Sequence, residues 1–428
     1  MSRELRQPLP DPRRMPDAQV IVVGGGPAGA ATATFLASAG VDVMLLDRAH
    51  FPRDKPCSEY MSPQASRILD ALGVLQTVEL TGAAELKGMR VHAPNGKVIH
   101  GEFLSDHGFR GYRDRGLAVR RTILDKILID RARAAGVRVE EGARVSDVVR
   151  DARGRVCGVE VGARSRERRV LTSRLVIGAD GLRSVVGRRL GLIRLSAWPR
   201  RIALVTHYSG VEGTTGFGEM YVDRGGYCGV ASVGGGLTNV AVVVPASRGA
   251  EVAVDRTDFL ESWIAERAAI APMFANATRV DEVRATGPFA SSARRGWAPG
   301  AALVGDAADF FDPFTGEGIY AALRGGEMLA SHAVDAVRRD GSGKSLDLPL
   351  RAYDRVRRAE FSGKWKVERL IGAGVGFPAL INRAATILSG RRDMADLLVG
   401  VVGDFVPARE VLRPGYLLRM LFALPART

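Results

Sequence analysis

The chain has 428 residues, 46% of them hydrophobic and 25% charged, a composition typical of a globular protein that is too long for one hydrophobic core. Its formal net charge of +14 is spread along the chain without a long run of like charges, and no zinc-finger spacing or other nucleic-acid signature accompanies it, so we expect no nucleic-acid partner. Three widely spaced cysteines exclude a disulfide framework, and neither a signal peptide nor a stretch of 18 apolar residues is found, which predicts a cytoplasmic protein.

The first 48 residues contain the pattern of a βαβ unit. We expect residues 1–17, which are polar and rich in proline and arginine, to form a disordered tail. After them come an apolar strand at Gln19–Val23, an alanine-rich helix at Pro27–Ala39 and a second apolar strand at Val41–Leu46. This order predicts two parallel strands joined by a right-handed crossover.

The turn between the first strand and the helix has the glycine spacing of a dinucleotide-binding site. Within Gly24–Gly29, Gly24 permits the tight turn, Gly26 lets a pyrophosphate approach the backbone, and Gly29 lets the helix pack close to the sheet. Asp47 ends the second strand about 20 residues further on, where an acid hydrogen-bonds a ribose. A glycine-rich turn without a ligand is the alternative, and the complete order of strand, helix, strand and acid argues against it.

Helical and strand patterns alternate along the rest of the chain. Up to residue 195, helices are predicted at Pro63–Leu72 and Arg121–Ala135, and strands within 86–112 and at Val137–Val139, Val145–Val149, Val156–Val161 and Leu175–Gly178. Residues 196–283 have the alternation of an antiparallel sheet, with strands at Ile202–Tyr208, Phe217–Val222, Tyr227–Val233 and Asn239–Val244 and a helix at Asp258–Ala275. From residue 346 the pattern is mostly helical.

A further strand end carries an acidic residue far downstream. Ala301–Val304 is an apolar strand that runs into Gly305 and Asp306, and a helix is expected to begin near Gly316–Ile319. Asp306 is placed to accept hydrogen bonds from the ribityl hydroxyls of a flavin. The positive N-terminal end of the helix is placed to face the flavin N1–C2=O edge, where negative charge accumulates on reduction. These segments therefore predict FAD rather than NAD as the resident cofactor.

The same segments resemble those of the flavoprotein superfamily that contains p-hydroxybenzoate hydroxylase and the geranylgeranyl reductases. Three fingerprints carry the resemblance: Gly24–Gly29 with Asp47, Gly178–Gly181 with Ser184, and Gly305-Asp306 with Pro313, Gly316 and Gly318. The resemblance implies an α/β fold in which a Rossmann-like FAD-binding domain (18–85, 113–195 and 284–345) is interrupted by an antiparallel β-sheet substrate domain (86–112 and 196–283) and followed by a helical C-terminal region (346–428).

The resemblance also implies which residues contact the cofactor. One contact is an arginine ahead of a helix, for which Arg121 matches best and Arg120 is a close competitor. The expected FAD-binding residues are Gly24, Gly26, Pro27, Ala28, Gly29, Asp47, Arg48, Arg121, Asp180, Gly181, Gly305, Asp306, Gly316, Gly318 and Ile319.

The reaction is less sharply indicated, because the chain is similar to the geranylgeranyl reductase-like branch only in part. Phe51–Cys57 and Asp312–Tyr320 match that branch. Gly-Gly or Gly-Asp usually follows the cysteine there, whereas Ser58-Glu59 stands here, and Gly226–Val230 lacks the branch's Trp-x-Phe-Pro type segment. We therefore expect an NAD(P)H-dependent monooxygenase of an apolar aromatic or polyketide-like substrate. The alternatives are a reductase of prenyl or quinone side-chain double bonds and, in another class, a non-catalytic flavin-fold lipid carrier.

Two other flavoprotein classes are not expected. Flavin halogenases need a Trp-x-Trp-x-Ile-Pro segment, which the sequence lacks. Disulfide reductases need a paired-cysteine motif and a second dinucleotide fold, but Gly234–Gly236 is not followed by a helical pattern. NADPH or NADH is therefore expected to act as a transient reductant without a Rossmann domain of its own.

Several residues have both a functional and a structural interpretation. The catalytic candidates are Cys57, Pro313 and Gly316, although a free cysteine is also a common core filler. Asp312 and Glu317 either transfer protons or cap the following helix. The basic amphipathic segment Leu412–Leu424 either contacts a membrane surface or covers the substrate domain. Tyr208, Tyr221 and Tyr227 are expected in the core or pocket wall. The six histidines lack ligand spacing, so no metal is expected, and the oligomeric state stays open.

Overall fold

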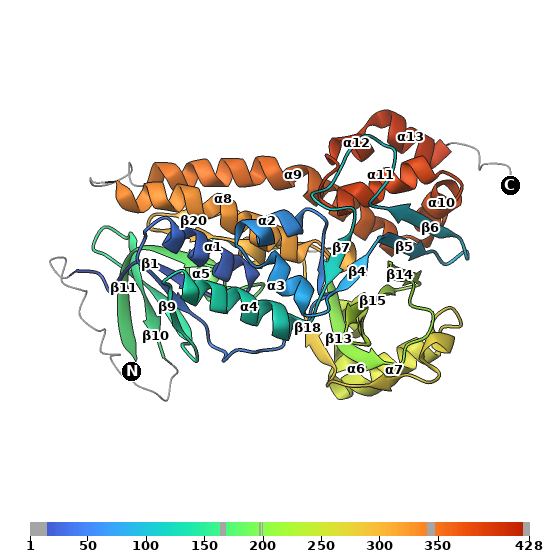
Figure 1. Ribbon diagram of the computed structural model, residues 1–428, viewed down its shortest axis with the longest axis horizontal. Coiled ribbons are helices and arrows are strands. Elements are labelled where there is room, and N and C mark those ends of the chain that lie inside the picture. The colour runs from blue at the N-terminus through green and yellow to red at the C-terminus, as the bar shows by residue number, and fades with distance from the viewer. Residues whose placement is uncertain (1–14, 163–167, 197, 199, 340–346, 423–428) are drawn as a thin grey trace.

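Two eight-stranded sheets organise the fold, and helices from the C-terminal part of the chain lie beside the second one. Figure 1 shows the computed structural model, which describes residues 15–162, 168–196, 198, 200–339 and 347–422. The long helices α8 (Gly318–Arg338) and α9 (Leu348–Gly376) run along the first sheet, and α9 ends near the C-terminal helices. This α/β architecture confirms the predicted fold class.

The first sheet has parallel central strands, as the βαβ pattern predicts. Its order is β20 (Trp297–Ala298), β21 (Ala301–Leu303), β11 (Arg169–Gly178), β1 (Ala18–Val23), β2 (Val43–Leu46) and β8 (Arg138–Glu140), and β10 (Val156–Val161) and β9 (Val145–Arg150) extend it from β11. Val20 and Val22 pack into one core cluster, whereas Ile21 and Val23 pack into another. A strand buried on both faces reads as a continuous apolar run, which explains why β1 has no polar alternation.

Helices α1 (Pro27–Ser38), α4 (Arg121–Ala134) and α8 cover one face of this sheet. The contact between α1 and α8 depends on small residues. A Cβ atom on Gly326 would lie 3.1 Å from the Ala28 carbonyl oxygen and 3.0 Å from the Thr32 hydroxyl oxygen. This close packing fixes the position of both helix starts at the carboxyl edge of the sheet.

The second sheet is antiparallel except for one pair of strands. Its order is β17 (Thr278–Arg279), β13 (Arg201–Ser209), β16 (Leu237–Pro245), β15 (Gly226–Gly234), β14 (Gly218–Asp223), β5 (Gly88–His92) and β6 (Val98–Glu102), with β18 (Arg284–Thr286) also paired to β13. Strands β14 and β5 are parallel. Leu204 and Val242 pack beneath α7 (Arg256–Ala265), whereas Ala203 and Val243 belong to a cluster on the opposite face.

The remaining elements are short, apart from the C-terminal helices. Two three-stranded sheets contain β3 (Tyr60–Met61), β7 (Gly116–Ala118) and β4 (Ala84–Leu86), and β12 (Ile193–Leu195), β19 (Ser291–Ala293) and β22 (Asp309–Phe310). The other helices are α2 (Ala65–Ala71), α3 (Leu75–Leu80), α5 (Val185–Arg189), α6 (Gly249–Val254), α10 (Pro378–Leu388), α11 (Arg392–Val402), α12 (Arg409–Leu412) and α13 (Pro414–Phe422), with 3-10 turns at Ala246–Arg248, Ala271–Phe274, Gly305–Ala307 and Pro313–Thr315.

Two element predictions were wrong in extent. The helix predicted at Asp258–Ala275 ends at Ala265, and only a 3-10 turn follows at Ala271–Phe274. Pro272 lacks an amide N–H and restricts the residue before it, which excludes a helix that continues through Ala271–Ala275. The strand predicted at Leu175–Gly178 begins earlier, at Arg169, because its first half pairs with β10 before its second half pairs with β1.

Both ends of the chain extend past the described residues. Of the predicted tail, residues 1–14 lie outside them, whereas the Asp17 backbone N–H donates to the Thr172 hydroxyl at 3.1 Å. The predicted amphipathic segment corresponds largely to α13, in which Tyr416 is buried and Leu418 and Phe422 are exposed. In the described residues no single helix is long and apolar enough to cross a bilayer, and only the pair α9 and α10, bent by 112°, meets the length and composition criteria jointly.

Candidate functional site

The glycine turn between β1 and α1 leaves space for a ligand beside its backbone. Gly24 has φ +104°, and a Cβ atom there would lie 2.4 Å from the Ala179 carbonyl oxygen. A Cβ atom on Gly29 would lie 1.8 Å from the Gly24 carbonyl oxygen. At Gly26, by contrast, the nearest atom to such a Cβ is an Arg53 Nη2 atom at 3.4 Å. Gly24 and Gly29 are therefore needed for folding of the turn, whereas Gly26 keeps open a space next to a cation.

Two guanidinium groups stand at this space. Arg121, at the start of α4, is 3% exposed, and its Nη2 atom lies 3.8 Å from the Cβ position of Gly26. Its Nε and Nη2 atoms donate to the two Asp125 carboxylate oxygens at 2.8 and 2.9 Å. Arg53 reaches the same carboxylate at 3.1 Å. Asp125 thus holds both arginines beside the N-terminus of α1, an arrangement that suits a pyrophosphate.

Asp47 fixes the conformation of the glycine turn. Its Oδ2 atom accepts from the Gly25 backbone N–H at 2.7 Å, and its Oδ1 atom accepts from the Ala49 backbone N–H at 2.8 Å. These bonds explain why an acid stands at the end of β2, and the predicted ribose contact stays a prediction. Arg48 is exposed beside it, and its predicted contact likewise stays a prediction.

Asp180 and Gly181, the Asp-Gly pair that follows β11, have different roles in the structure. The Asp180 carboxylate accepts from the Ser184 hydroxyl and the Val185 backbone N–H, both at 2.6 Å, and so binds the start of α5. Burial raises the pKa of Asp180, and the hydrogen bond from Ser184 partly offsets this effect. Gly181, with φ +77°, lines the cavity. The sequence assigned both residues to FAD, and the structure brings only Gly181 to the cavity wall.

The downstream fingerprint forms the other side of the same cavity. Gly305 has φ +63° and packs against Ala28, whose Cβ atom would lie 2.8 Å from a Cβ atom on the glycine. Asp306 lines the cavity, and its Oδ2 atom lies 3.5 Å from the Lys55 Nζ atom. The start of α8 also lines it, through Gly316, Gly318 and Ile319 together with the neighbouring Pro27 and Pro313. As predicted, the glycine turn before α1 and the start of α8 line the same cavity.

We expect replacement of Asp306 by alanine to weaken FAD binding by about 1.5–3 kcal/mol, the usual value of a hydrogen bond to a charged group. Fluorescence titration of the apoprotein with FAD measures this loss. Asp335→Ala, at an exposed position near the C-terminal end of α8, is the control and should bind FAD as the wild type does. Equal affinities for the Asp306 and Asp335 variants would contradict the assignment of Asp306.

The cavity extends from the glycine turn to the second sheet. It encloses about 1460 Å³, including open solvent at its mouth. The wall formed by the second sheet is largely apolar and includes Ala203, Val205, Met220, Tyr227 and Val243. Tyr208 and Tyr221 pack instead in the cluster beneath α7. Of the three tyrosines considered from the sequence, Tyr227 is the one that reaches the cavity wall.

Asp312 joins the second sheet to the turn before α8. Its carboxylate accepts from the Tyr227 hydroxyl at 2.6 Å, from the Phe314 backbone N–H at 3.1 Å and from Arg201. Burial raises the pKa of Tyr227 well above its ordinary value, and the negative charge of Asp312 adds to this effect. Asp312 therefore caps the 3-10 turn Pro313–Thr315, which is the structural interpretation of this residue.

Glu317 has no capping hydrogen bond, contrary to the capping interpretation, and belongs to a buried carboxyl pair. Its Oε2 atom lies 3.0 Å from the Lys364 Nζ atom, and its carboxyl group contacts that of Glu368. Burial raises the pKa of both acids, and for Glu368 the charge of Glu317 raises it further. Both residues line the cavity. Two like charges disfavour each other, so ionisation of one acid of this pair opposes ionisation of the other, while the Lys364 ammonium lowers the pKa of Glu317.

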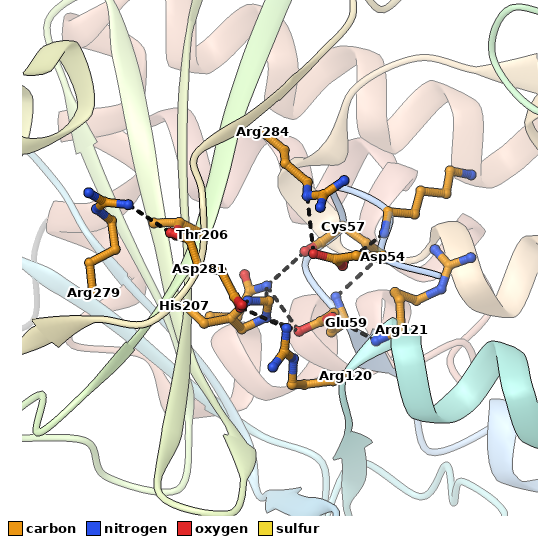
Figure 2. Close-up of polar contacts among 12 residues, drawn as sticks. Asp54, Cys57, Glu59, Arg120, Arg121, Thr206, His207, Arg279, Asp281 and Arg284 are labelled. Carbon is orange, nitrogen blue, oxygen red and sulfur yellow. Dashed lines mark hydrogen bonds and ion pairs between the residues drawn. The ribbon is translucent and has the colours of Figure 1, made fainter. Parts of the chain in front are cut away.

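Cys57 lies on the cavity wall in a fixed loop. Its Sγ atom accepts from the Glu59 backbone N–H at 3.3 Å, and its carbonyl oxygen accepts from the Asn239 side chain at 2.9 Å. Figure 2 shows this loop between the start of α4 and strand β13, which carries His207. The predicted catalytic residues Cys57, Pro313 and Gly316 thus line one cavity, and their catalytic roles stay predictions.

Several residues of this site were missed from the sequence. Arg53 lies beside the glycine turn and pairs with Asp125, and Lys55 pairs with Asp306. Glu368 comes from α9, which was described only as helical. The signal for two of them was present, because Arg53 and Lys55 lie within the family-like segment that ends at Cys57. Nothing in the local sequence indicates that Glu368 meets Glu317.

Comparison with known proteins agrees with this geometry. A family model described as an FAD binding domain matches residues 17–359. The chain is 31% identical over 396 residues to digeranylgeranylglycerophospholipid reductase 2 of Methanopyrus kandleri, covering 90% of this chain and 93% of that protein. It is 31% identical over 421 residues to menaquinone reductase of Mycobacterium tuberculosis, covering 91% of each. A flavoprotein/dehydrogenase from Cytophaga hutchinsonii has the same fold, with a TM-score of 0.79 at 22% identity over 95% of this chain and 97% of that one.

Proposed function

Because the chain belongs to the FAD binding domain family and is an FAD-dependent oxidoreductase, we propose that it reduces a double bond in a prenyl or quinone side chain, with NADH or NADPH as the transient reductant. The observation that carries the proposal is a thiol, Cys57, on the wall of a cavity that joins the glycine turn to an apolar sheet face. The two relatives named above support it, since both are named as reductases and align along most of this chain.

The residues present fit FAD. Arg53, Arg121 and the N-terminus of α1 would hold its pyrophosphate, Asp306 would accept from its hydroxyl groups, and the N-terminus of α8 would favour negative charge beside it. When bound, FAD supplies the hydride for a reduction of this kind. The remaining chemistry belongs to the chain itself.

The chain's own work is orientation, exclusion of water and delivery of one proton. Val205, Met220 and Val243 provide an apolar surface for a hydrocarbon chain, since such ligands bind in largely apolar pockets. Reduction of a carbon–carbon double bond adds a hydride to one carbon and a proton to the other. Cys57 holds a proton at Sγ on the cavity wall, and solvent restores that proton after the reaction.

Oxygenation is the second candidate, because Ser58-Glu59 and Gly226–Val230 depart from the reductase-like pattern. The two reactions differ in their need for O₂. We expect the reduced enzyme, under anaerobic conditions, to be reoxidised by a lipid quinone or prenyl lipid, with a product that carries two additional hydrogen atoms on its side chain and not on a quinone ring. Stopped-flow absorbance of the flavin and mass spectrometry of the product measure this.

The same experiment identifies the alternatives. Reoxidation only in the presence of O₂, with a product heavier by one oxygen atom, would show that the enzyme is a monooxygenase. Binding of the lipid without reoxidation under either condition would indicate a carrier. Each outcome rejects the proposed reduction in a distinguishable way.

A further inference from the structure

The residue two positions after Cys57 has an unfavourable backbone conformation. Glu59 has φ +61°, a region that residues with a side chain rarely occupy. It is also 1% exposed, although it carries a carboxylate. A buried acid in a left-handed conformation must be held by its surroundings, so its contacts show what fixes the loop after Cys57.

Three donors hold the Glu59 carboxylate. Its Oε1 atom accepts from the Arg121 backbone N–H at 2.7 Å. Its Oε2 atom lies 2.6 Å from the His207 Nε2 atom and accepts from the Asn239 side-chain amide at 3.1 Å. His207 and Asn239 come from β13 and β16 of the second sheet, whereas Arg121 begins α4. Glu59 therefore joins the start of α4 to β13 and β16 of the second sheet, two residues after Cys57 (Figure 2).

His207 is itself held between two carboxylates. Its Nδ1 atom lies 2.8 Å from the Asp281 Oδ2 atom, in an ion pair rather than an aligned hydrogen bond. Asp281 also pairs with Arg120 at 2.7 Å, and its backbone oxygen accepts from Thr206 and Arg279. Since both ring nitrogens face carboxylate oxygens, the ring fits its contacts best as an imidazolium. In the described residues, no group of three or more His, Cys, Asp or Glu side chains is arranged to hold a metal.

The protonation of His207 has opposing causes. Burial lowers its pKa, but the hydrogen bond from the ring to Glu59 and the negative charges of Glu59 and Asp281 outweigh burial and the charge of Arg120, so the pKa is raised above its usual value. The imidazolium contacts are therefore fully present at low pH and are lost as pH rises through this raised pKa.

We propose that His207 is a positioning residue for Cys57: by anchoring the Glu59 carboxylate, it holds the strained loop in which the Glu59 N–H meets the Cys57 sulfur. Asn239 supports the same loop through the Cys57 carbonyl oxygen at 2.9 Å. The inference rests on the proposed function, in which Cys57 delivers a proton. The anchoring by His207 explains how a glutamate can occupy position 59, whose left-handed backbone conformation glycine adopts without strain.

The test measures the reactivity of the Cys57 thiol in the holoenzyme without substrate. Alkylation by iodoacetamide is followed by mass spectrometry of the Cys57 peptide, with Cys157 as the internal reference. Loss of one hydrogen bond to the reacting sulfur should slow alkylation roughly 2- to 12-fold in His207→Gln. His332→Gln, a histidine on α8, is the matched control and should leave the rate unchanged. An unchanged rate in His207→Gln overturns the proposal.

A double-mutant cycle shows whether His207 acts through Glu59. Glu59→Gly accepts the left-handed conformation without an anchor, so adding His207→Gln to it should change alkylation less than about twofold. Equal slowing by His207→Gln in both backgrounds overturns the proposal, because His207 would then act by another route. If His207→Gln does not fold, Asp281→Asn replaces it in both arms, since its side chain is 26% exposed.

The pH dependence gives a second readout. The ratio of the wild-type alkylation rate to that of His207→Gln should exceed one at low pH and fall to one as pH rises, since the imidazolium is then lost. A ratio that does not depend on pH contradicts the imidazolium role. Because no substrate is present, failure of the anaerobic reduction described above would reject the proposed function and leave this result unaffected.

Discussion

Replacement of Gly26 by valine is expected to abolish FAD binding while leaving the fold intact. The Cβ atom would enter the space beside the turn, 3.4 Å from Arg53 and 3.8 Å from Arg121, where the pyrophosphate must approach the backbone. Its contacts are the ends of flexible side chains, so the apoprotein should still fold. The measurement is the visible flavin absorbance per protein after purification, followed by titration of the colourless protein with FAD.

The control for this substitution is Gly249→Val. Gly249 begins α6, and a Cβ atom there would meet no atom within 4 Å. This variant should retain its flavin. Normal FAD binding by Gly26→Val would show that the pyrophosphate lies elsewhere, and recovery of FMN alone from the wild type would reject the dinucleotide site as a whole.

Replacement of Cys57 by alanine should reduce the anaerobic rate of substrate reduction by about 10²- to 10⁴-fold, the usual contribution of a general acid. The thiol lines the cavity, and alanine holds no proton for the substrate carbon. Single-turnover reoxidation of the reduced enzyme measures the rate of this step without the preceding reduction by NADH or NADPH.

Cys157→Ala is the matched control, because Cys157 is also partly buried but lies on β10, away from the cavity. It should react at the wild-type rate. If Cys57→Ala also keeps the wild-type rate, the proton comes from another group on the cavity wall, and Glu368 is then the first to test. A monooxygenase would give no anaerobic reoxidation in either variant, and its O₂-dependent rate would lose little in Cys57→Ala, since oxygen transfer needs no thiol.

The sequence predicted the parts of the fold that depend on local periodicity. Strands such as Val156–Val161 were placed with their observed bounds, and the glycine turn was recognised because its spacing reflects contacts within one βαβ unit. The helix at 258–275 was overextended, because Pro272 was given too little weight. Hydrophobic periodicity indicates that a helix or strand is present, but it does not show at which residue that element ends.

The polar network behind Cys57 was beyond the reach of the sequence. Glu59 and His207 are separated by 148 residues along the chain, and they meet because the loop before β3 lies against β13 of the second sheet. The same holds for Glu317 and Glu368, which come from different helices. The departure from glycine after Cys57 was noticed as a difference from the reductase-like pattern. The positive φ of Glu59, which is known only from the structure, shows that a glutamate in place of glycine has to be held there by other residues.

The two faces of the second sheet have different neighbours: one lines the cavity and the other packs beneath α7. Along β13, Ala203 and Val205 face the cavity, whereas Leu204 packs beneath α7. We expect mutations at the cavity-facing positions to change the shape of the cavity while leaving the separate hydrophobic cluster beneath α7 unchanged. We therefore expect substrate range to respond to substitutions at these alternate positions of β13 more than at Leu204, which packs on the other face.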